Sequence, residues 1–123
     1  MADKFQDLEH FDQADIEAAI IRNAPDEISF VPLIVALSSS DQHLAMTVCA
    51  GLATHGDPQV RGNAVMSLGH IARRFRQLDE SLVKPIIERA LQDQDDQVRI
   101  LAKSAADEIH QFLHWTISGH SYT

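Results

Sequence analysis

The sequence predicts an all-α protein built from short antiparallel helix pairs. Apolar residues recur every three or four positions along the 123 residues, and no segment alternates apolar and polar residues long enough to predict a strand. The breaks between these periodic segments contain aspartates that can cap helices, together with prolines. Apolar residues make up 45% of the chain but aromatic residues only 6%, which favours thin helical layers. We therefore expect one domain with a single modest core.

Three helices are predicted in the first half of the chain. The first covers residues 12–23 and ends before a proline. The second is expected over 26–38, with Asp26 as its N-cap, and the third over 41–56, with Asp41 as its N-cap. Four apolar residues of the second helix share one helical face and are expected to point inward: Phe30, Leu33, Ile34 and Leu37.

Three more helices are predicted in the second half, over residues 57–76, 79–91 and 95–115. Each begins at an aspartate that can accept hydrogen bonds from the free N–H groups of the first turn. The residues expected to face the core are Val60, Ala64, Leu68, Ile71, Leu82, Ile86, Ile87, Ala90, Leu91, Val98, Ala102, Ala105, Ile109 and Leu113. Trp115 is expected to pack at the end of the last helix, and the unpatterned tail from Thr116 is expected to fray or to pack loosely.

The chain also resembles itself at a fixed offset. Asp57 and Asp95 lie 38 residues apart, and each is followed by a Gln-Val-Arg sequence two positions later. A second alignment sets Asp41 over Asp57, an offset of 16 residues. The two offsets imply different helix partners, so the pairing of the helices stays open at this point.

The segments 57–72 (DPQVRGNAVMSLGHIA) and 95–102 (DDQVRILA) resemble the HEAT-repeat family, including its phycobilisome-lyase-like variants. The resemblance implies a short right-handed α-solenoid of about three helix pairs in one domain, residues 1–123. The acidic segment 1–11 would precede the stacked helices of 12–115, and the tail 116–123 would follow them. The resemblance also implies that Arg61 and Arg99 bond to loop aspartates of adjacent repeats.

Charge divides the chain into two unlike halves. Residues 1–60 hold ten carboxylates against Lys4 and Arg22, whereas residues 61–123 are balanced, so the net charge of −8 lies in the first half. Such a field attracts basic partners and repels nucleic acid and anionic membranes. We therefore expect a protein partner, and neither nucleic acid nor a membrane. The acidic N-terminus does not resemble a secretory leader, and the expected location is cytoplasmic.

No motif predicts catalysis, a cofactor or a metal. His110 and His114 have a spacing that can place two imidazoles on one metal, but helix-surface histidines often show it by chance. Cys49 lies in an apolar stretch and is interpreted as an inert core residue, because a buried thiol is a poor nucleophile. The three arginines of segment 73–76 suit the C-terminal end of a helix. The chain is therefore expected to be non-enzymatic and to need no cofactor.

Two functional hypotheses stay open. In the first, the chain is similar in size, charge and fold to the all-helical immunity proteins of contact-dependent growth-inhibition systems. It would bind and occlude a basic toxin or nuclease domain, whose cleft is positive in order to hold phosphates. In the second, it is a HEAT-repeat scaffold or accessory subunit that holds a peptide or an enzyme. The residues expected to contact the partner are Asp7, Glu9, Asp12, Asp15, Glu17, Asp26, Glu27 and Tyr122.

Overall fold

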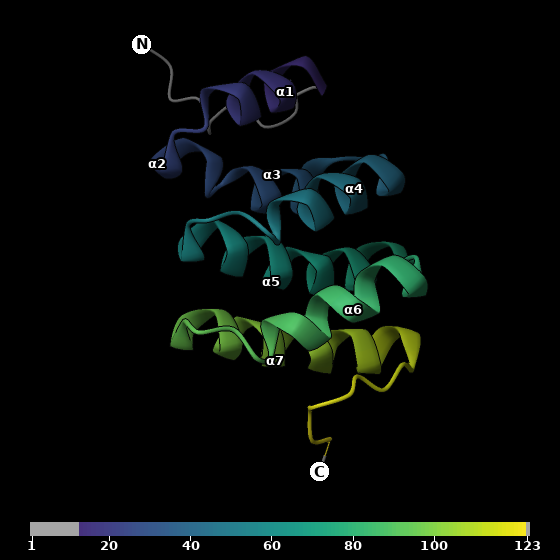
Figure 1. The fold of residues 1–123 in the computed structure, drawn as a ribbon. Coiled ribbons are helices and arrows are strands. Elements are labelled where there is room, and N and C mark those ends of the chain that lie inside the picture. Colours follow the sequence, from purple (N-terminus) through teal and green to yellow (C-terminus); the bar gives the residue numbers. More distant parts are fainter. Residues whose placement is uncertain (1–12, 123) are drawn as a thin grey trace.

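The computed structural model of the protein describes residues 13–122, and every regular element in this range is an α-helix (Figure 1). The all-α prediction is confirmed. The helices, in chain order, are α1 (Gln13–Arg22), α2 (Pro25–Ile28), α3 (Val31–Ser38), α4 (Gln42–Leu52), α5 (Pro58–Phe75), α6 (Glu80–Ala90) and α7 (Asp96–Leu113). No helix of residues 13–122 combines the length and the apolar character that crossing a membrane requires.

Four of the predicted aspartate caps are confirmed. The Oδ1 atoms of Asp41 and Asp79 accept hydrogen bonds from the third residue after them, over 3.0 and 3.3 Å. Those of Asp57 and Asp95 accept from the second residue after them, over 2.8 and 2.9 Å. Each bond satisfies an N–H group that has no partner inside its helix, and each cap stabilises its helix by about 1 kcal/mol. These aspartates therefore set where α4, α5, α6 and α7 begin.

The second predicted helix is wrong in its cap and in its continuity. Its N-cap is Ala24, which makes no side-chain cap bond, and it begins at Pro25. It then breaks between α2 and α3, because Pro32 has no N–H for the carbonyl four residues before it. Asn63 of α5 lies across the break, and its Nδ2 donates to the Ser29 carbonyl over 2.9 Å.

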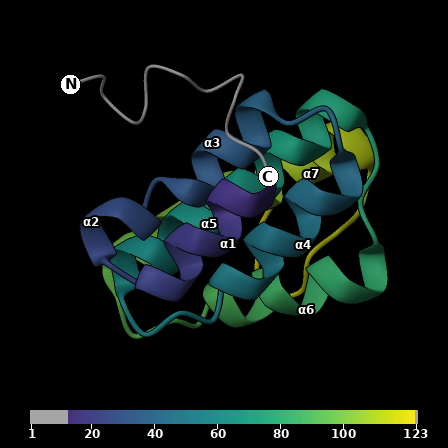
Figure 2. The ribbon, with the colours of Figure 1, turned by 90° about the horizontal axis from the view of Figure 1, so that it is seen from above.

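The helices form a stack of two layers. Helices α3, α5 and α7 lie side by side in one layer, and α4 and α6 pack against them in the other. Figure 1 shows the stack running from α1 at one end to α7 at the other, and Figure 2 looks along it from above. The pairs α4–α5 and α6–α7 therefore repeat one unit. Only the 38-residue alignment describes this unit, since the 16-residue alignment sets α4 over its own partner α5. The right-handed twist of the solenoid stays a prediction.

Helices α5 and α7 form the centre of the core. The predicted inward residues of both helices from Val60 to Ile71 and from Val98 to Ile109 are fully buried. The two axes approach closely where α5 has glycine. A Cβ built on Gly69 would lie 3.1 Å from the Cα of Ala105. The small side chains of this interface therefore permit the tight stacking of the two long helices.

Other parts of the predicted inward face are wrong. Phe30, Leu37 and Leu82 are 42, 50 and 39% exposed. The break before α3 leaves Phe30 at the cap and resets the phase of the helix, so that Val31 and Val35 are buried and Phe30 and Leu37 are not. The expected burial of Ile34 is confirmed. On α6, Leu82 lies in the first turn, at the rim of the layer.

Of the two predicted arginine–aspartate bonds between adjacent repeats, the structure contains one. Arg61 of α5 reaches the loop between α6 and α7 and forms a bidentate ion pair with Asp93, Nε–Oδ2 2.8 Å and Nη2–Oδ1 2.9 Å. Arg99, its equivalent on α7, bonds only to nearby residues: the Asp93 carbonyl in the preceding loop and the Asp96 carboxylate at the start of α7. Within the described chain α7 is the last helix, so no following repeat offers Arg99 an aspartate.

The tail packs closely against the fold, contrary to the expectation that it frays or packs loosely. Ile117 is only 2% exposed. Its N–H donates to the Tyr122 hydroxyl over 2.9 Å, and His120 Nε2 lies 2.7 Å from Asp107 Oδ1 on α7. Trp115 packs against the core, as predicted. Residues 114–122 thus fold back along α7 and cover the end of the stack.

Candidate protein-binding surface

The acidic residues of α1 and α2 gather at the first end of the stack (Figure 1). Asp15, Glu17 and Asp26 are exposed. Glu27 is half-buried and accepts two hydrogen bonds from Arg22, over 2.9 and 2.8 Å. The hydrogen bond to Glu27 is the main reason that the pKa of Arg22 is raised. Three further predicted contact residues lie outside the described residues: Asp7, Glu9 and Asp12.

Tyr122, the remaining predicted contact residue, lies far from this acidic group. The described chain ends beyond α7, at the opposite end of the stack from α1 (Figure 1). The Tyr122 ring lies between the rings of His110 and His120, tilted against the first and edge-to-face with the second, with centroid distances of 4.3 and 4.7 Å. The predicted contact residues that the structure describes therefore do not form one surface.

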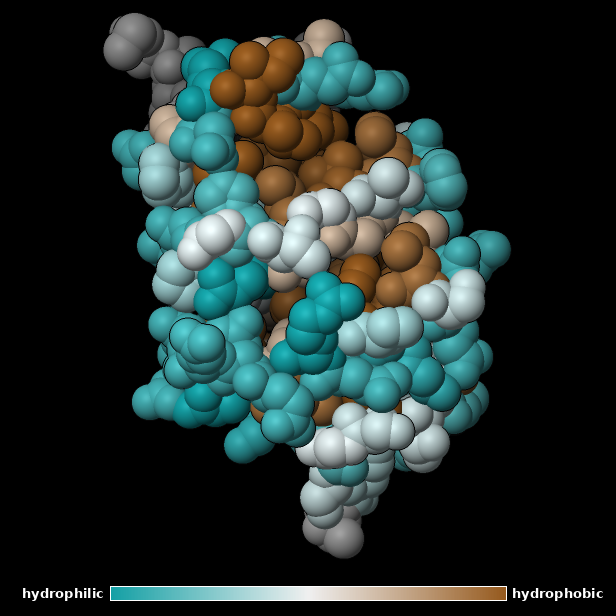
Figure 3. All heavy atoms as spheres, viewed as in Figure 1, coloured by the Kyte–Doolittle hydropathy of each residue, from teal (hydrophilic) through white to brown (hydrophobic). Residues whose placement is uncertain are grey.

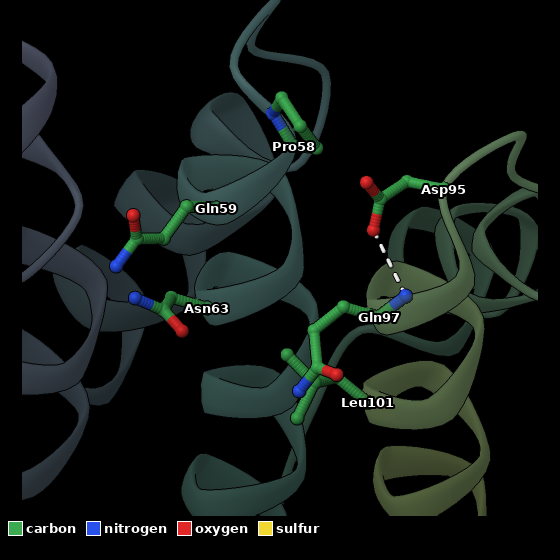
Figure 4. Close-up of a pocket in the computed structure, with 6 residues that line it drawn as sticks. All are labelled: Pro58, Gln59, Asn63, Asp95, Gln97 and Leu101. Atoms are coloured by element: carbon green, nitrogen blue, oxygen red, sulfur yellow. Dashed lines mark hydrogen bonds between the residues drawn. The ribbon is translucent and has the colours of Figure 1, made fainter.

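A groove that the sequence did not predict opens between the N-terminal ends of α5 and α7 (Figure 4). Its volume is about 380 Å³. The lining residues are Pro58, Gln59, Asn63, Asp95, Gln97 and Leu101. Figure 4 shows the amides of Gln59 and Asn63 next to each other on α5, and the Gln97 side chain beside Leu101 on α7. Because Gln59 and Gln97 occupy equivalent positions of the 38-residue repeat, the repeat itself was the available sequence signal.

The polar groups of the groove retain unused hydrogen-bonding capacity. Asp95 uses Oδ1 for the N–H groups of Gln97 and Val98, over 2.9 and 3.1 Å. No hydrogen bond joins the side-chain amides of Gln59 or Gln97 to another of residues 13–122. Side-chain amides both donate and accept, so the groove offers both kinds of group to a partner.

A second, more apolar depression lies where α4 faces α6. Its volume is about 450 Å³, and Leu82, Pro85 and Ile86 of α6 form one of its sides. Gly51 of α4 lies on the other side, where a Cβ would meet open space. Figure 3 shows apolar side chains gathered on this face of the molecule, both near α1 and between α4 and α6. Such a surface can contribute apolar contact area to a protein interface.

The residues considered for catalysis or metal binding are either buried in the core or part of the end of a helix. Cys49 is fully buried, and burial raises the pKa of its thiol. His110 Nδ1 donates to the Trp115 carbonyl over 2.9 Å, and His114 leaves the helix as the left-handed C-cap of α7. Among residues 13–122 there is no group of three His, Cys, Asp or Glu side chains placed to hold a metal.

The basic segment at the end of α5 is likewise used inside the fold. Arg74 Nη1 donates to the Ala36 carbonyl at the end of α3, over 2.6 Å. Arg73 pairs with Glu108 of α7 at 3.2 Å. Arg76 is the left-handed C-cap of α5. These arginines therefore fasten α5 to its two neighbours in the layer.

Comparison with known proteins identifies a solved structure with a similar fold. No protein-family model and no curated protein sequence matches the chain. The structure is similar to a chain in the crystal structure of a CDI complex from Cupriavidus taiwanensis LMG 19424, with a TM-score of 0.70 and 24% sequence identity. The likeness covers 82% of this chain and 89% of that chain. The helical stack is therefore an architecture that the two chains share nearly from end to end.

Proposed function

We propose that this chain is a non-catalytic immunity protein that binds and occludes a basic toxin domain of the contact-dependent growth-inhibition type. The observation that carries the proposal is the likeness in fold to a chain of a CDI complex, which extends over most of both chains. CDI abbreviates contact-dependent growth inhibition. Likeness of fold is an argument by analogy, so the site must supply the rest of the case.

The charge distribution supports a basic partner. The carboxylates of Asp15, Glu17 and Asp26 are exposed at one end of the stack, while Arg22 is held by Glu27. A partner with a positive cleft would be steered to this end, because complementary potentials accelerate encounter. A nuclease has such a cleft, since it must hold phosphates. Covering the cleft would inhibit the enzyme without any chemistry on the part of this chain.

The proposal is tested by capture followed by inhibition. The tagged full chain is used to isolate partners from cells of its source organism at about 50 mM and about 500 mM salt, and these are identified by mass spectrometry. The captured partner is then assayed for nuclease activity with and without one equivalent of this chain. We expect one basic partner near 1:1 stoichiometry, held less tightly at high salt and inhibited by this chain.

Other results would contradict the proposal. A large assembly, an acidic partner insensitive to salt, or a partner whose activity is unchanged by this chain would favour the scaffold or accessory role. A test variant has Asp15, Glu17 and Asp26 neutralised, with Gln59 and Gln97 unchanged. Under the proposal, this variant captures less partner at low salt.

A further inference from the structure

The residues that line the groove between α5 and α7 include one carboxylate and no basic side chain. Asp95 is the one charged residue among its lining residues, and it is half-buried at the mouth of the groove. Its Oδ1 caps α7, which leaves Oδ2 without a hydrogen bond to any of residues 13–122. A carboxylate oxygen in this position favours a cationic group over a neutral or anionic one.

The arginines near the groove cannot supply that cation, because both are bound elsewhere. The Arg61 guanidinium holds the Asp93 carboxylate and two loop carbonyls. Arg99 is held by the Asp93 carbonyl and by Asp96. Neither arginine therefore hydrogen-bonds Asp95, although the Arg61 charge acts on it through space.

The shape and lining of the groove suit a long side chain with a charged end. Pro58 and Leu101 provide apolar surface on which a methylene chain can lie, as Lys and Arg stems do elsewhere. The side-chain oxygens of Gln59 and Gln97 are further acceptors at the rim. The volume of about 380 Å³ lies at the lower end of the range for small-molecule sites, which is about 300–1,000 Å³.

We propose that this groove receives a lysine or arginine side chain of the protein partner, with Asp95 as its counter-charge and the two glutamines as hydrogen-bond acceptors. The inference rests on the proposed function in taking a basic protein as the partner. It places a specific contact toward the α7 end of the stack, whereas the acidic residues of α1 and α2 at the other end supply long-range attraction alone.

The groove is tested directly with a small probe, independently of any toxin. The ¹⁵N-labelled full chain is titrated with the tripeptide acetyl-Gly-Arg-Gly-amide, and with the neutral isostere acetyl-Gly-citrulline-Gly-amide, while NMR follows the backbone and side-chain amides. We expect saturable shifts at the side-chain amides of Gln59 and Gln97, with a dissociation constant in the roughly millimolar range. The citrulline peptide should bind about fivefold more weakly or not at all.

Two variants and one matched control locate the contact. Asp95→Asn keeps a capping oxygen but removes the charge, and should weaken arginine binding roughly fivefold. Gln97→Lys puts a cation into the groove from an exposed position and should abolish the shifts. Asp41→Asn makes the same change at the cap of α4, outside the groove, and should leave binding unchanged. Thermal unfolding checks that each variant is folded.

The inference is overturned if arginine and citrulline bind alike, if Asp41→Asn weakens binding as much as Asp95→Asn, or if the shifts do not involve the groove. None of these results would affect salt-sensitive capture of a basic inhibited partner, so failure of the inference is distinguishable from failure of the proposed function. Conversely, arginine binding in the groove would stand even if the captured partner were not a nuclease.

Discussion

Arg61 and Asp93, which lie on successive repeats, form a bidentate ion pair with N···O distances of 2.8 and 2.9 Å. The same guanidinium donates from Nη1 to the carbonyls of His55 and Gly56, over 3.0 and 3.1 Å. Asp93 in turn accepts the N–H of Asp95 over 3.0 Å. One arginine therefore joins the α4–α5 loop to the α6–α7 loop, and so holds both sides of the candidate groove in register.

The stability supplied by this pair should depend on pH. The Arg61 hydrogen bonds are the main reason that the pKa of Asp93 lies below its ordinary value. A lowered folded-state pKa stabilises the fold above the unfolded pKa of about 4, and this stability is lost as the pH falls through the folded value. Asp93→Asn should therefore lower the free energy of unfolding by about 1–2 kcal/mol at pH 7, and by less below about pH 4. Urea unfolding at both pH values measures the difference.

Asp96→Asn is the matched control, three residues further on, at the first residue of α7. Asp96 pairs with Arg99, but its side chain is 86% exposed. An exposed pair of this kind contributes little, so the change should be within about 0.5 kcal/mol. Equal losses in the two variants, or a loss at Asp93 that does not change with pH, would contradict the role given to the Arg61 pair.

Two helical glycines should respond in opposite ways to alanine. Gly69→Ala would bring a Cβ within 3.1 Å of the Ala105 Cα and of Glu108 Oε1, so α5 and α7 would have to move apart. We expect a loss of about 1–3 kcal/mol. Gly51→Ala meets nothing within 4 Å and should gain about 0.5–1 kcal/mol from reduced backbone entropy. Thermal unfolding compares the two, and a gain at Gly69 would show that the layer is less tightly packed than the distances indicate.

Local chemistry made most of the fold predictable. The four capping aspartates and the buried faces of α5 and α7 follow from bonds and burial within single helices, which the sequence displays. The break between α2 and α3 also had a local signal in Pro32, but the sequence could not show that the Ser29 carbonyl at the break is satisfied by Asn63, 34 residues later. The sequence likewise could not show that Arg99 bonds only to nearby residues, because that depends on the absence of a following helix in the described chain.

The candidate site was less predictable than the fold. Charge alone singled out seven carboxylates in the first 27 residues, of which the structure describes the four on α1 and α2 and leaves Asp7, Glu9 and Asp12 outside its range. Charge could not indicate Gln59 or Gln97, which are neutral. Their joint position depends on which helices are neighbours, and the two competing repeat offsets left that pairing undecided in the sequence.

Cys49 should be unreactive in the folded protein. The thiol is fully buried, its Sγ lies 3.6 Å from the Pro32 carbonyl, and burial raises its pKa. The thiolate is the reactive form, so reaction with a disulfide reagent at about pH 8 should be at least about 100-fold slower than in the urea-unfolded chain. Absorbance of the released thiol measures both rates. Rapid reaction without denaturant would contradict this prediction and would show that α4 opens locally to expose Cys49.

The acidic end of the stack should act on the rate of encounter with the partner. Neutralising Asp15, Glu17 and Asp26 by Asn or Gln should lower the association rate constant about tenfold at low salt, with little change in dissociation. The difference should nearly vanish at about 0.5 M salt, where charges are screened within a few ångströms. Stopped-flow fluorescence with the captured partner measures both constants.

The matched control removes the same charge from elsewhere, by neutralising Asp41, Glu80 and Glu88 on the α4–α6 layer. If only net charge mattered, both triple variants would slow association equally. If the end formed by α1 and α2 faces the partner, the first triple variant should be much slower than the second, because the potential at the contact falls off within about 10 Å at moderate salt. No effect in either variant would place the partner on a surface that these carboxylates do not reach.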